Sequence, residues 1–351
     1  MNELAGAIGR NFPPVIYACA FSIWKKPIVR QFFAGSQVVF VRSASQVPAN
    51  SSLLVWGRKP VRGKLPAGVQ LIHLEDGFLR SVGLGADLIR PLSWVIDDRG
   101  IYYDATQPSG LEVLLQTTEF TPELLARAVW LRERIVSTGL TKYNVGSSGW
   151  QRPAGAGCVI LVPGQVESDA SLRFGAPGIC TNLGLLRAVR EANPNAYLLY
   201  KPHPDVVAGL RRKGRDEDEA GRWCDEVVAD VVMSDLLLQV DEVHTLTSLT
   251  GFEALLRGKA VTCYGQPFYA GWGLTMDMQP IPRRSRRLSL DMLVAGTLIL
   301  YPIYISRTTG QFTTPERALD ELLAWRKTSA LGLPWWYHVY RLLKRRVLRQ
   351  P

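Results

Sequence analysis

Short apolar runs and amphipathic helical patterns follow one another along most of the chain. The apolar runs predict buried strands at 37–41, 52–56, 69–74, 92–96, 101–103, 158–162, 197–200, 243–246 and 259–264. Apolar positions at helical spacing predict helices over 122–137, 182–192 and 234–238, and another over 14–33 that Pro27 kinks or divides. Strands mixed with helical patterns indicate an α/β protein.

Local capping and turn signals refine two of these elements. Thr121 stands just before the helix over 122–137 and Pro122 occupies its first position, so both favour a helix start there. Asp98-Arg99-Gly100 lies between two predicted strands and indicates a hairpin turn. Asp97, Asp98 and Asp104 surround this turn without histidine or a glycine-loop pattern. We therefore interpret them as turn residues and expect no metal site.

The length of 351 residues fits two domains better than one. Residues 143–157 are rich in Gly, Ser, Pro and Asn, which indicates an interdomain linker. We predict an N-terminal domain over 1–148, a C-terminal domain over 149–325 and a separate C-terminal helix over 326–351. The pattern alone supports a two-domain α/β protein and no finer class.

The charge balance favours anionic partners, because the net charge is +10 and the isoelectric point is about 9.5. Nucleic acid is the weaker alternative, since the sequence has no zinc-finger spacing, RNA-binding aromatic motif or helix-turn-helix signal. The five cysteines are scattered without a close pair, and Cys158 and Cys263 lie in predicted buried strands. Such usage is typical of a reduced, cytosolic protein.

Two apolar stretches are interrupted before they reach the length of a membrane span. Lys25, Lys26 and Pro27 end the stretch at 14–24, and the stretch at 290–305 contains Asp291 and Pro302. We expect neither a membrane span nor a cleavable signal peptide.

The C-terminal end has a different pattern, in which Trp335 and Trp336 stand next to Arg341, Lys344, Arg345, Arg346 and Arg349. Paired tryptophans beside basic residues predict an interfacial helix on an anionic membrane surface. The alternative is a helix that docks on the N-terminal domain with a solvated basic face.

The stretch over 243–275 reads as strand, helix and strand, with Thr247 and Ser248 where the helix begins. A helix N-terminus attracts anions, so this junction is a candidate phosphate site. Gly251 lets the first helical turn approach a bulky group, and Glu253 is placed to accept a ribose hydroxyl. The alternative is an ordinary Ser/Thr cap.

Lys201-Pro202-His203-Pro204 follows the predicted strand at 197–200. Each proline disfavours helix for the residue before it, so Lys201 and His203 are presented rigidly at a strand end. Ligands of open α/β sheets bind at that edge. A phosphate-bearing leaving group suits Lys201, His203 and the helix that begins at Ser248.

Carboxylates follow two other strands. Glu75 and Asp76 end a buried strand, where they are costly unless paired or functional, and Arg80 or backbone N–H groups are the alternative partners. Glu167 and Asp169 lie in the loop over 163–171. From the residues alone, Asp169 either caps the following segment or is a candidate nucleophile.

Five blocks of the sequence resemble the bacterial capsule-synthesis glycosyltransferases of the KpsC type. They are EDGFLRSVG at 75–83, PGQVESDAS at 163–171, KPHP at 201–204, TLTSLTGFEALLRGKAV at 245–261 and YGQPFYAGWGLT at 264–275. The resemblance covers about residues 37–325 and the blocks occur in the family's order. Members of this type carry two such modules in tandem, whereas this sequence shows one.

The resemblance implies a GT-B-like α/β fold, with two Rossmann-like domains facing across a cleft. It also implies retaining transfer of β-Kdo from CMP-Kdo to a Kdo glycolipid linker in capsular polysaccharide biosynthesis. Asp169 then forms a covalent Kdo adduct, and Glu75, preferred over Asp76, deprotonates the acceptor. Beyond the donor CMP-Kdo we expect no cofactor.

The binding residues implied by the resemblance form two groups. The donor group comprises Gln165, Lys201, His203, Thr247, Ser248, Gly251 and Glu253, with Gln266, Tyr269 and Trp272 lining the donor pocket. The group for the Kdo carboxylate and the acceptor comprises Arg80, Ser81, Ser171, Arg173, Tyr269 and Trp272. For Phe268, Tyr269 and Trp272 the alternative is hydrophobic packing of a long loop.

The expected partners are CMP-Kdo, a lipid-linked Kdo acceptor, the anionic inner-membrane surface and other capsule-assembly proteins, without nucleic acid. The expected location is cytoplasmic and peripheral on the inner membrane. One alternative keeps the fold but uses CMP-sialic acid or CDP-glycerol as donor. Another is a non-catalytic scaffold that binds glycolipid at the membrane surface.

Overall fold

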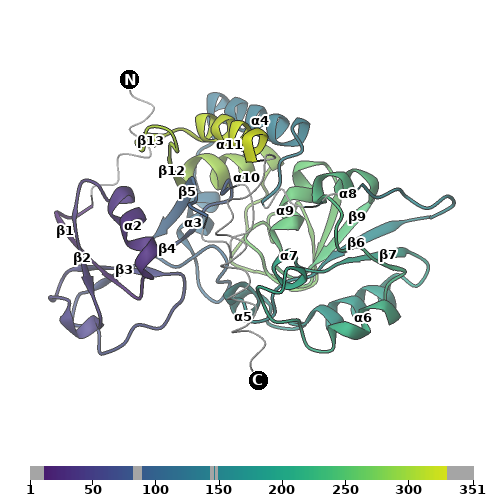
Figure 1. The fold of residues 1–351 in the computed structure, drawn as a ribbon, viewed down its shortest axis with the longest axis horizontal. Helices are drawn as coiled ribbons and strands as arrows, with labels where there is room; N and C mark the ends of the chain where they lie inside the picture. Colours follow the sequence, from purple (N-terminus) through teal and green to yellow (C-terminus); the bar gives the residue numbers. More distant parts are fainter. Residues whose placement is uncertain (1–11, 82–88, 143–145, 147–148, 330–351) are drawn as a thin grey trace.

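The computed structural model describes residues 12–81, 89–142, 146 and 149–329, and its framework consists of two β-sheets (Figure 1). The first sheet has seven strands in the order β13-β12-β5-β4-β3-β1-β2. They are β1 Val15–Cys19, β2 Gln37–Val41, β3 Ser52–Trp56, β4 Gln70–Asp76, β5 Ser93–Asp97, β12 Pro302–Ile305 and β13 Phe312–Thr313. Strands β1 to β4 pair in parallel, and the pairs that involve β5, β12 and β13 are antiparallel.

The second sheet has six strands, all paired in parallel, in the order β11-β10-β9-β6-β7-β8. They are β6 Val159–Pro163, β7 Tyr197–Lys201, β8 Glu226–Val227, β9 Glu242–Thr245, β10 Ala260–Cys263 and β11 Met276–Asp277. Strand β6 is buried at every position. Its unbroken apolar run is typical of a central parallel strand, which is covered on both faces. The predicted α/β class is confirmed.

Helices cover both sheets and fill the space above their junction (Figure 1). The α-helices are α2 Lys26–Phe32, α3 Gly110–Thr117, α4 Pro122–Ser137, α5 Ala170–Gly175, α6 Asn182–Ala192, α7 Pro204–Val207, α8 Met233–Gln239, α9 Leu249–Leu256, α10 Leu290–Val294 and α11 Pro315–Ser329. Short 3₁₀ turns are η1 Ile23–Lys25, η2 Ala44–Gln46 and η4 Glu217–Arg222, and η5 Ala295–Leu300 is a π-helix. Helices α4 and α6 have the bounds predicted from the sequence, and the Thr121 side chain accepts the backbone N–H of Leu124 as a cap.

Two local predictions were wrong. Residues 14–33 do not form one helix, because 15–19 form β1 between β2 and β3, and Pro27 lies in the first turn of α2 instead of kinking a longer helix. Residues 101–103 do not form a strand of a hairpin. The buried Asp97 accepts the N–H groups of Arg99, Gly100 and Gly110 and the hydroxyl of Tyr301, and β5 pairs with the distant β12 instead.

Within the predicted C-terminal domain, 149–325, the chain returns to the first sheet. Strand β12 pairs antiparallel with β5, and β13 extends the same sheet. Helix α11 runs across residue 326, so no separate helix begins there. Ion pairs of Arg127 with Glu316 and of Arg132 with Asp291 fasten α4 to α11 and α10. The tryptophan-rich basic end and residues 143–145 and 147–148 of the predicted linker lie outside the described residues.

The five cysteines are free. Cys263 is buried as predicted, but Cys158 precedes β6 and is exposed. Among the helices of the described ranges, none combines the length and apolar character that crossing a bilayer requires. Those ranges also hold no group of three or more His, Cys, Asp or Glu side chains arranged for a metal ion.

Candidate active site

A cavity of about 810 Å³ opens between the two sheets and takes its walls from both. The first sheet contributes the residues that follow β3 and β4, and the second contributes the loops after β6 and β7 and the start of α9. Strand β6 has β7 on one side and β9 on the other, so the strand order reverses at β6. A crevice at the carboxyl end of such a reversal is where open α/β sheets bind ligands.

Most of the predicted site residues line this cavity. They are Glu75, Asp76, Gln165, Asp169, Ser171, Arg173, Lys201, His203, Thr247, Ser248 and Glu253. Arg80, Ser81, Gly251, Gln266, Tyr269 and Trp272 are not among the lining residues.

Glu75 and Asp76 end β4, half-buried at the cavity wall, and their pKa values shift in opposite directions. Burial, followed by the charge of Asp76, raises the pKa of Glu75 to about 7. Burial also acts on Asp76, but Arg80 and Lys25 outweigh it and lower the pKa of that carboxyl. Neighbouring carboxyls whose pKa values differ in this way suit different roles. Glu75 suits a proton acceptor near neutral pH, and Asp76 suits a fixed negative charge.

Arg80 is the partner of Asp76 and lies away from the cavity. Its Nε donates to Asp76 Oδ2 at 2.6 Å, Nη1 donates to the Ser81 hydroxyl and Nη2 donates to the carbonyl of Ile89. Only 3% of Arg80 is exposed. The structure therefore supports the alternative in which Arg80 pairs with Asp76, and it does not bring Arg80 or Ser81 to the proposed sugar site.

Two residues that no sequence motif marked, Lys25 and Tyr103, interact electrostatically with Glu75. Lys25 lies over the Trp56 ring, and burial lowers its pKa to about 8 against the opposing charges of Asp76 and Glu75. The Tyr103 hydroxyl accepts the backbone N–H of Arg58 at 3.0 Å. A Cβ at Gly57, whose φ is +52°, would lie 2.4 Å from that hydroxyl and 3.1 Å from Glu75 Oε2. A glycine is thus needed where the phenol and the carboxylate approach the backbone.

Asp169 lies on the opposite wall, at the N-cap position of α5. Its side chain makes no capping hydrogen bond, which removes the main support for a purely structural role. Instead, Oδ1 accepts a 2.9 Å hydrogen bond from the Arg211 guanidinium, and both side chains are about 40% exposed. The carboxylate is therefore accessible and faces a counter-charge on the cavity rim.

His203 caps the short helix α7 through its ring. Nδ1 accepts the backbone N–H of Asp205, which places the ring proton on Nε2. Burial, with smaller contributions from Lys142 and Arg211, lowers the pKa of His203 to about 3. His203 is therefore neutral at physiological pH and offers a ligand an N–H donor without a full positive charge.

Lys201 has a more structural place than expected from the sequence. Its ammonium donates to the carbonyls of Ala229, at 3.1 Å, and Val231, at 2.7 Å, and only 7% of the residue is exposed. Burial lowers its pKa. Lys201 still lines the cavity, but two of its three donors hold the loop after β8.

Gln165 and Thr247 join the loop after β6 to the start of α9. The Gln165 amide donates to the Thr247 hydroxyl and accepts the Thr247 backbone N–H, at 3.0 and 2.9 Å. Ser248 caps α9 by accepting the N–H of Thr250. These contacts occupy N–H groups expected to be open to phosphate, and leave the side chains of Thr247 and Ser248 at the cavity wall.

Glu253 also contacts the chain itself. Its Oε1 accepts the backbone N–H of Lys142 at 2.6 Å, and Lys142 follows α4, which covers the first sheet (Figure 1). Burial raises its pKa, against that hydrogen bond and the charge of Arg257. Glu253 thus reaches the cavity and at the same time links the two halves.

In the aromatic loop after β10, most of the residues predicted to line the donor pocket contact the chain itself. Tyr269 and Trp272 are fully buried; the Tyr269 hydroxyl donates to the carbonyl of Ser248, and the Trp272 indole donates to that of Phe268. The Gln266 amide donates to the carbonyl of Pro280. Hydrophobic packing, the alternative stated for these aromatics, applies to Tyr269 and Trp272, while Phe268 lines the cavity.

Gly251 makes room for Tyr269 rather than for a ligand, since a Cβ there would lie 2.2 Å from the Tyr269 hydroxyl. We expect Gly251→Ala to lower the free energy of unfolding by about 1–3 kcal/mol, as overpacking of a core does. Urea unfolding measures this loss. Gly221→Ala is the matched control, because a Cβ at Gly221 meets nothing within 4 Å. If Gly251→Ala has unchanged stability but weakened nucleotide binding, Gly251 contacts the ligand, as predicted from the sequence.

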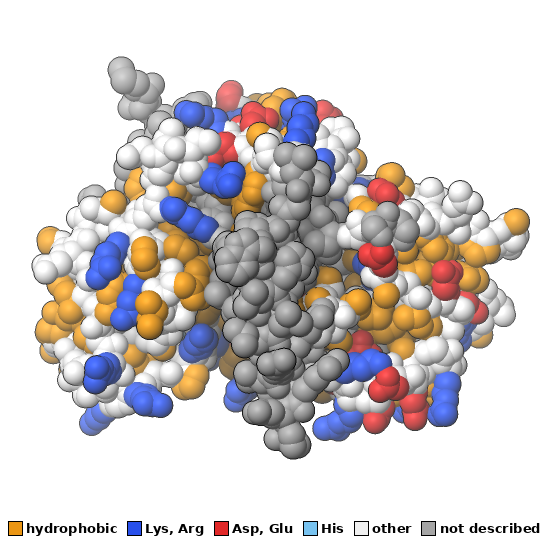
Figure 2. Space-filling view, viewed as in Figure 1, with side chains coloured by type: hydrophobic (Ala, Val, Ile, Leu, Met, Phe, Trp, Pro, Cys, Tyr) orange, Lys and Arg blue, Asp and Glu red, His pale blue; other side chains and the backbone are white. Residues whose placement is uncertain are grey.

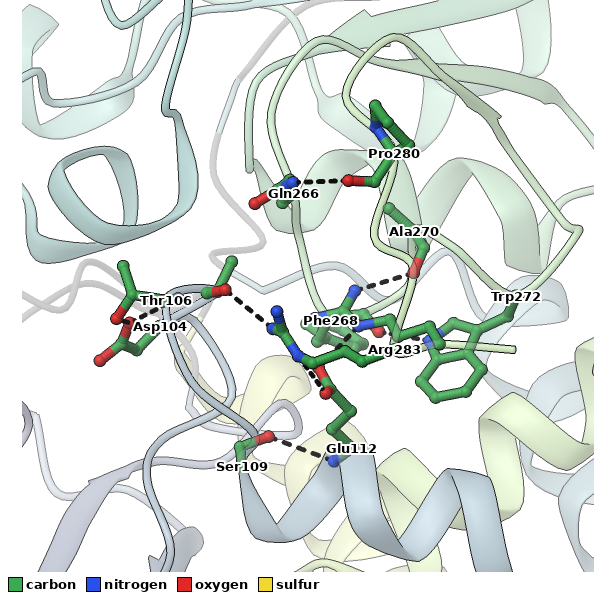
Figure 3. Close-up of polar contacts among 12 residues, drawn as sticks. Asp104, Thr106, Ser109, Glu112, Gln266, Phe268, Ala270, Trp272, Pro280 and Arg283 are labelled. Carbon is green, nitrogen blue, oxygen red and sulfur yellow. Dashed lines mark hydrogen bonds and ion pairs between the residues drawn. The ribbon is translucent and has the colours of Figure 1, made fainter. Parts of the chain in front are cut away.

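A buried ion-pair cluster, here called the Glu112 clamp, fixes this aromatic loop to the first half (Figure 3). Glu112 of α3 pairs with both Arg283 and Arg284, and 8% or less of the Glu112 and Arg284 side chains is exposed. Arg284 also donates to the carbonyls of Pro267 and Ala270, and Arg283 to that of Ala105. The clamp therefore sets where Phe268 stands on the cavity wall.

Comparison with known proteins places these features in a family. Residues 53–145 and 151–312 match the family described as "Capsule polysaccharide biosynthesis protein". The capsule polysaccharide modification protein LipA of Neisseria meningitidis serogroup A is 48% identical over 318 residues, which are 88% of this chain and 45% of LipA. The lipopolysaccharide-processing protein LpsZ of Rhizobium meliloti is 39% identical, over 88% of this chain and 74% of LpsZ. The chain thus spans about half the length of LipA.

Two solved structures share the fold. The β-Kdo 2,7-transferase of Thermosulfurimonas dismutans KpsC matches with a TM-score of 0.74 and 42% identity, covering 89% of this chain and 99% of that chain. The β-Kdo 2,4-transferase of the same organism's KpsC matches with a TM-score of 0.77 and 35% identity, covering 88% and 98%. The resemblance inferred from the five sequence blocks is confirmed, and the chain belongs to the capsule polysaccharide biosynthesis family.

Proposed function

We propose that this chain is a retaining glycosyltransferase that moves β-Kdo from CMP-Kdo to a Kdo-bearing glycolipid. The observation that carries the proposal is the cavity, where Glu75 of the first half faces a wall containing Asp169, His203 and Ser248 of the second half. Both KpsC modules named above are Kdo transferases of similar fold. We also propose that the two halves form a GT-B arrangement, with the donor on the second sheet.

In the proposed reaction, the bond between the anomeric carbon of Kdo and the phosphate of CMP breaks, and CMP leaves with the electron pair. Asp169 attacks from the other side and forms a glycosyl ester, which the acceptor oxygen then displaces. Two inversions give net retention. The acceptor proton passes to Glu75, whose raised pKa suits a base at neutral pH.

The donor phosphate lies beside His203 in this proposal. A neutral imidazole that donates from Nε2 stabilises the departing phosphate by a hydrogen bond, assisted by the Thr247 and Ser248 side chains at the start of α9. Ser171 and Arg173 of α5 also line the cavity, and the guanidinium of Arg173 is the proposed partner of the Kdo carboxylate. Glu253 is the proposed ribose contact.

Intact-protein mass spectrometry with CMP-Kdo generated in place tests the donor and the nucleophile together. We expect a mass gain of one Kdo on the wild-type chain and none on Asp169→Ala. Asp218→Ala is the matched control, because Asp218 also pairs with a basic side chain, Lys213, and does not line the cavity. It should label like the wild type.

Two results would contradict parts of this proposal. If the wild type gains no mass but releases CMP when acceptor is present, transfer proceeds without a trapped Asp169 adduct. If it neither gains mass nor releases CMP with a Kdo-bearing acceptor, the donor is not CMP-Kdo. Repeating the second experiment with CMP-sialic acid and CDP-glycerol then identifies which other donor is used.

A further inference from the structure

The segment that carries β1 to β3 and α2 has charges of one sign only. Residues 12–74 contain eight Lys or Arg residues and no Asp or Glu, although the whole chain has 31 acidic residues. In Figure 2 the left-hand part, which carries β1 to β3 and α2 in the same view as Figure 1, shows blue and orange side chains and no red ones. The corresponding part of the second half shows both signs of charge. A surface free of acidic groups is suited to an extended anionic partner.

An exposed apolar tip lies within this basic segment. Ile23, in the one-turn helix η1, is 84% exposed, and Trp24 beside it is half-buried. Basic side chains surround aromatic rings next to this tip: Lys26 and Arg30 lie 5.0 and 5.1 Å from the Phe40 ring. We call Ile23, Trp24, Lys26, Arg30 and Phe40 the η1 patch. Single exposed apolar residues are common, but an apolar tip among aromatic and basic side chains has the composition of a membrane-interface anchor.

The η1 patch adjoins the cavity. Phe21 packs edge-on against both Phe40 of the patch and Trp56, and Lys25 lies over the Trp56 ring. Trp56 itself lines the cavity, at the end of β3 and next to the strand that carries Glu75. A partner bound to the η1 patch therefore lies beside the cavity. Under the proposed function, a lipid-linked acceptor reaches Glu75 from that side.

We propose that the η1 patch is a docking surface for an anionic lipid bilayer, with Ile23 and Trp24 entering the headgroup region. Lipid accounts for all the features of the patch together. A bilayer supplies apolar depth for Ile23, an interface for the amphipathic Trp24, and anionic headgroups for Lys26 and Arg30. A nucleic acid would pair with Lys26 and Arg30 but would provide no apolar environment for Ile23.

Vesicle co-sedimentation of the full chain tests this surface without any sugar nucleotide, so its outcome does not depend on Kdo transfer. The probes are phosphatidylcholine vesicles and vesicles with an equal amount of phosphatidylglycerol. We expect binding to the mixed vesicles only, weakening as salt is raised. The double variant Ile23→Asp, Arg30→Glu lowers the net charge of the patch by three units. It should bind about a hundredfold more weakly, because each unit of charge near anionic lipid changes affinity about fivefold.

The matched control is Met276→Asp, Arg222→Glu, which makes the same changes in charge at exposed positions near the second sheet. It should bind like the wild type, and equal thermal midpoints for both double variants show that they remain folded. Wild-type binding by the Ile23 and Arg30 variant would overturn the proposal and assign lipid binding to another part of the chain. Failure of the wild type to bind the mixed vesicles would also overturn it. Binding of duplex DNA, or self-association in sedimentation, would then identify another occupant of the patch.

Discussion

Glutamine in place of Glu75 should lower the turnover number about 10²- to 10⁴-fold, the range that positioned general bases contribute. The amide keeps the shape of the side chain but cannot accept the acceptor's proton. In the wild type, turnover should rise as the pH increases through about 7, because Glu75 must be deprotonated to act and its pKa is raised to about 7. The Glu75→Gln variant should lose this dependence. Steady-state rates across the pH range measure both effects.

The same substitution should affect stability in the opposite direction. The folded-state pKa of Glu75 lies above the model-compound value of 4.5, so its contribution to stability is present below pH 4.5 and is lost as the pH rises to about 7. Glu75→Gln carries no charge and should therefore melt at a higher temperature than the wild type at pH 8, with a smaller difference at pH 4.5. Glu119→Gln, an exposed control, should change neither rate nor melting. A Glu75→Gln enzyme with near-normal turnover would exclude Glu75 as the base.

The elements predicted well from the sequence are those whose signals are local. The run at 52–56 is a strand with those bounds, and the helix over 122–137 starts at its Thr121 cap. The error at 14–33 has a physical reason, since a short apolar run fits a strand or a buried helix equally well. The pairing of 15–19 with β2 and β3 decides between them, and that pairing is not a local property.

The candidate site divides in the same way. Glu75, Asp169 and His203 follow strands in the sequence, and strand ends converge on the cavity wall, so their shared place could be predicted. Tyr269 and Trp272 belong to an equally suggestive motif, yet the motif cannot tell whether a ring faces the cavity or the core. Their burial depends on contacts with Ser248 and Phe268.

Residues that act on the site but lie far from its motifs in the sequence could not be predicted. Lys25 acts on the pKa of Glu75 from η1, fifty positions earlier in the chain. The Glu112 clamp joins residues more than 170 positions apart, and nothing in either segment marks the other as its partner. Only the fold brings these charges together.

The Glu112 clamp should be essential to stability. We expect Glu112→Ala to lower the free energy of unfolding by about 3–5 kcal/mol, because it leaves the buried guanidinium of Arg284 without its counter-charge. Urea unfolding at neutral pH measures the loss. Glu316→Ala is a matched control, since Glu316 also accepts two hydrogen bonds from one arginine, Arg127, but in a partly exposed pair. It should lose about 1 kcal/mol or less.

The clamp variant should also lose activity under conditions where it remains folded, for a reason distinct from stability. Arg284 holds the carbonyls of Pro267 and Ala270 on either side of Phe268, and Phe268 lines the cavity. Without Glu112, Arg284 and the loop that it holds lose their link to α3. The wall that Phe268 forms then shifts relative to Glu75, and the reacting groups lose alignment. Glu316→Ala leaves these contacts intact and should keep its turnover. If Glu112→Ala matched Glu316→Ala in both stability and rate, the aromatic loop would be positioned by its own packing around Tyr269 and Trp272, independently of the clamp.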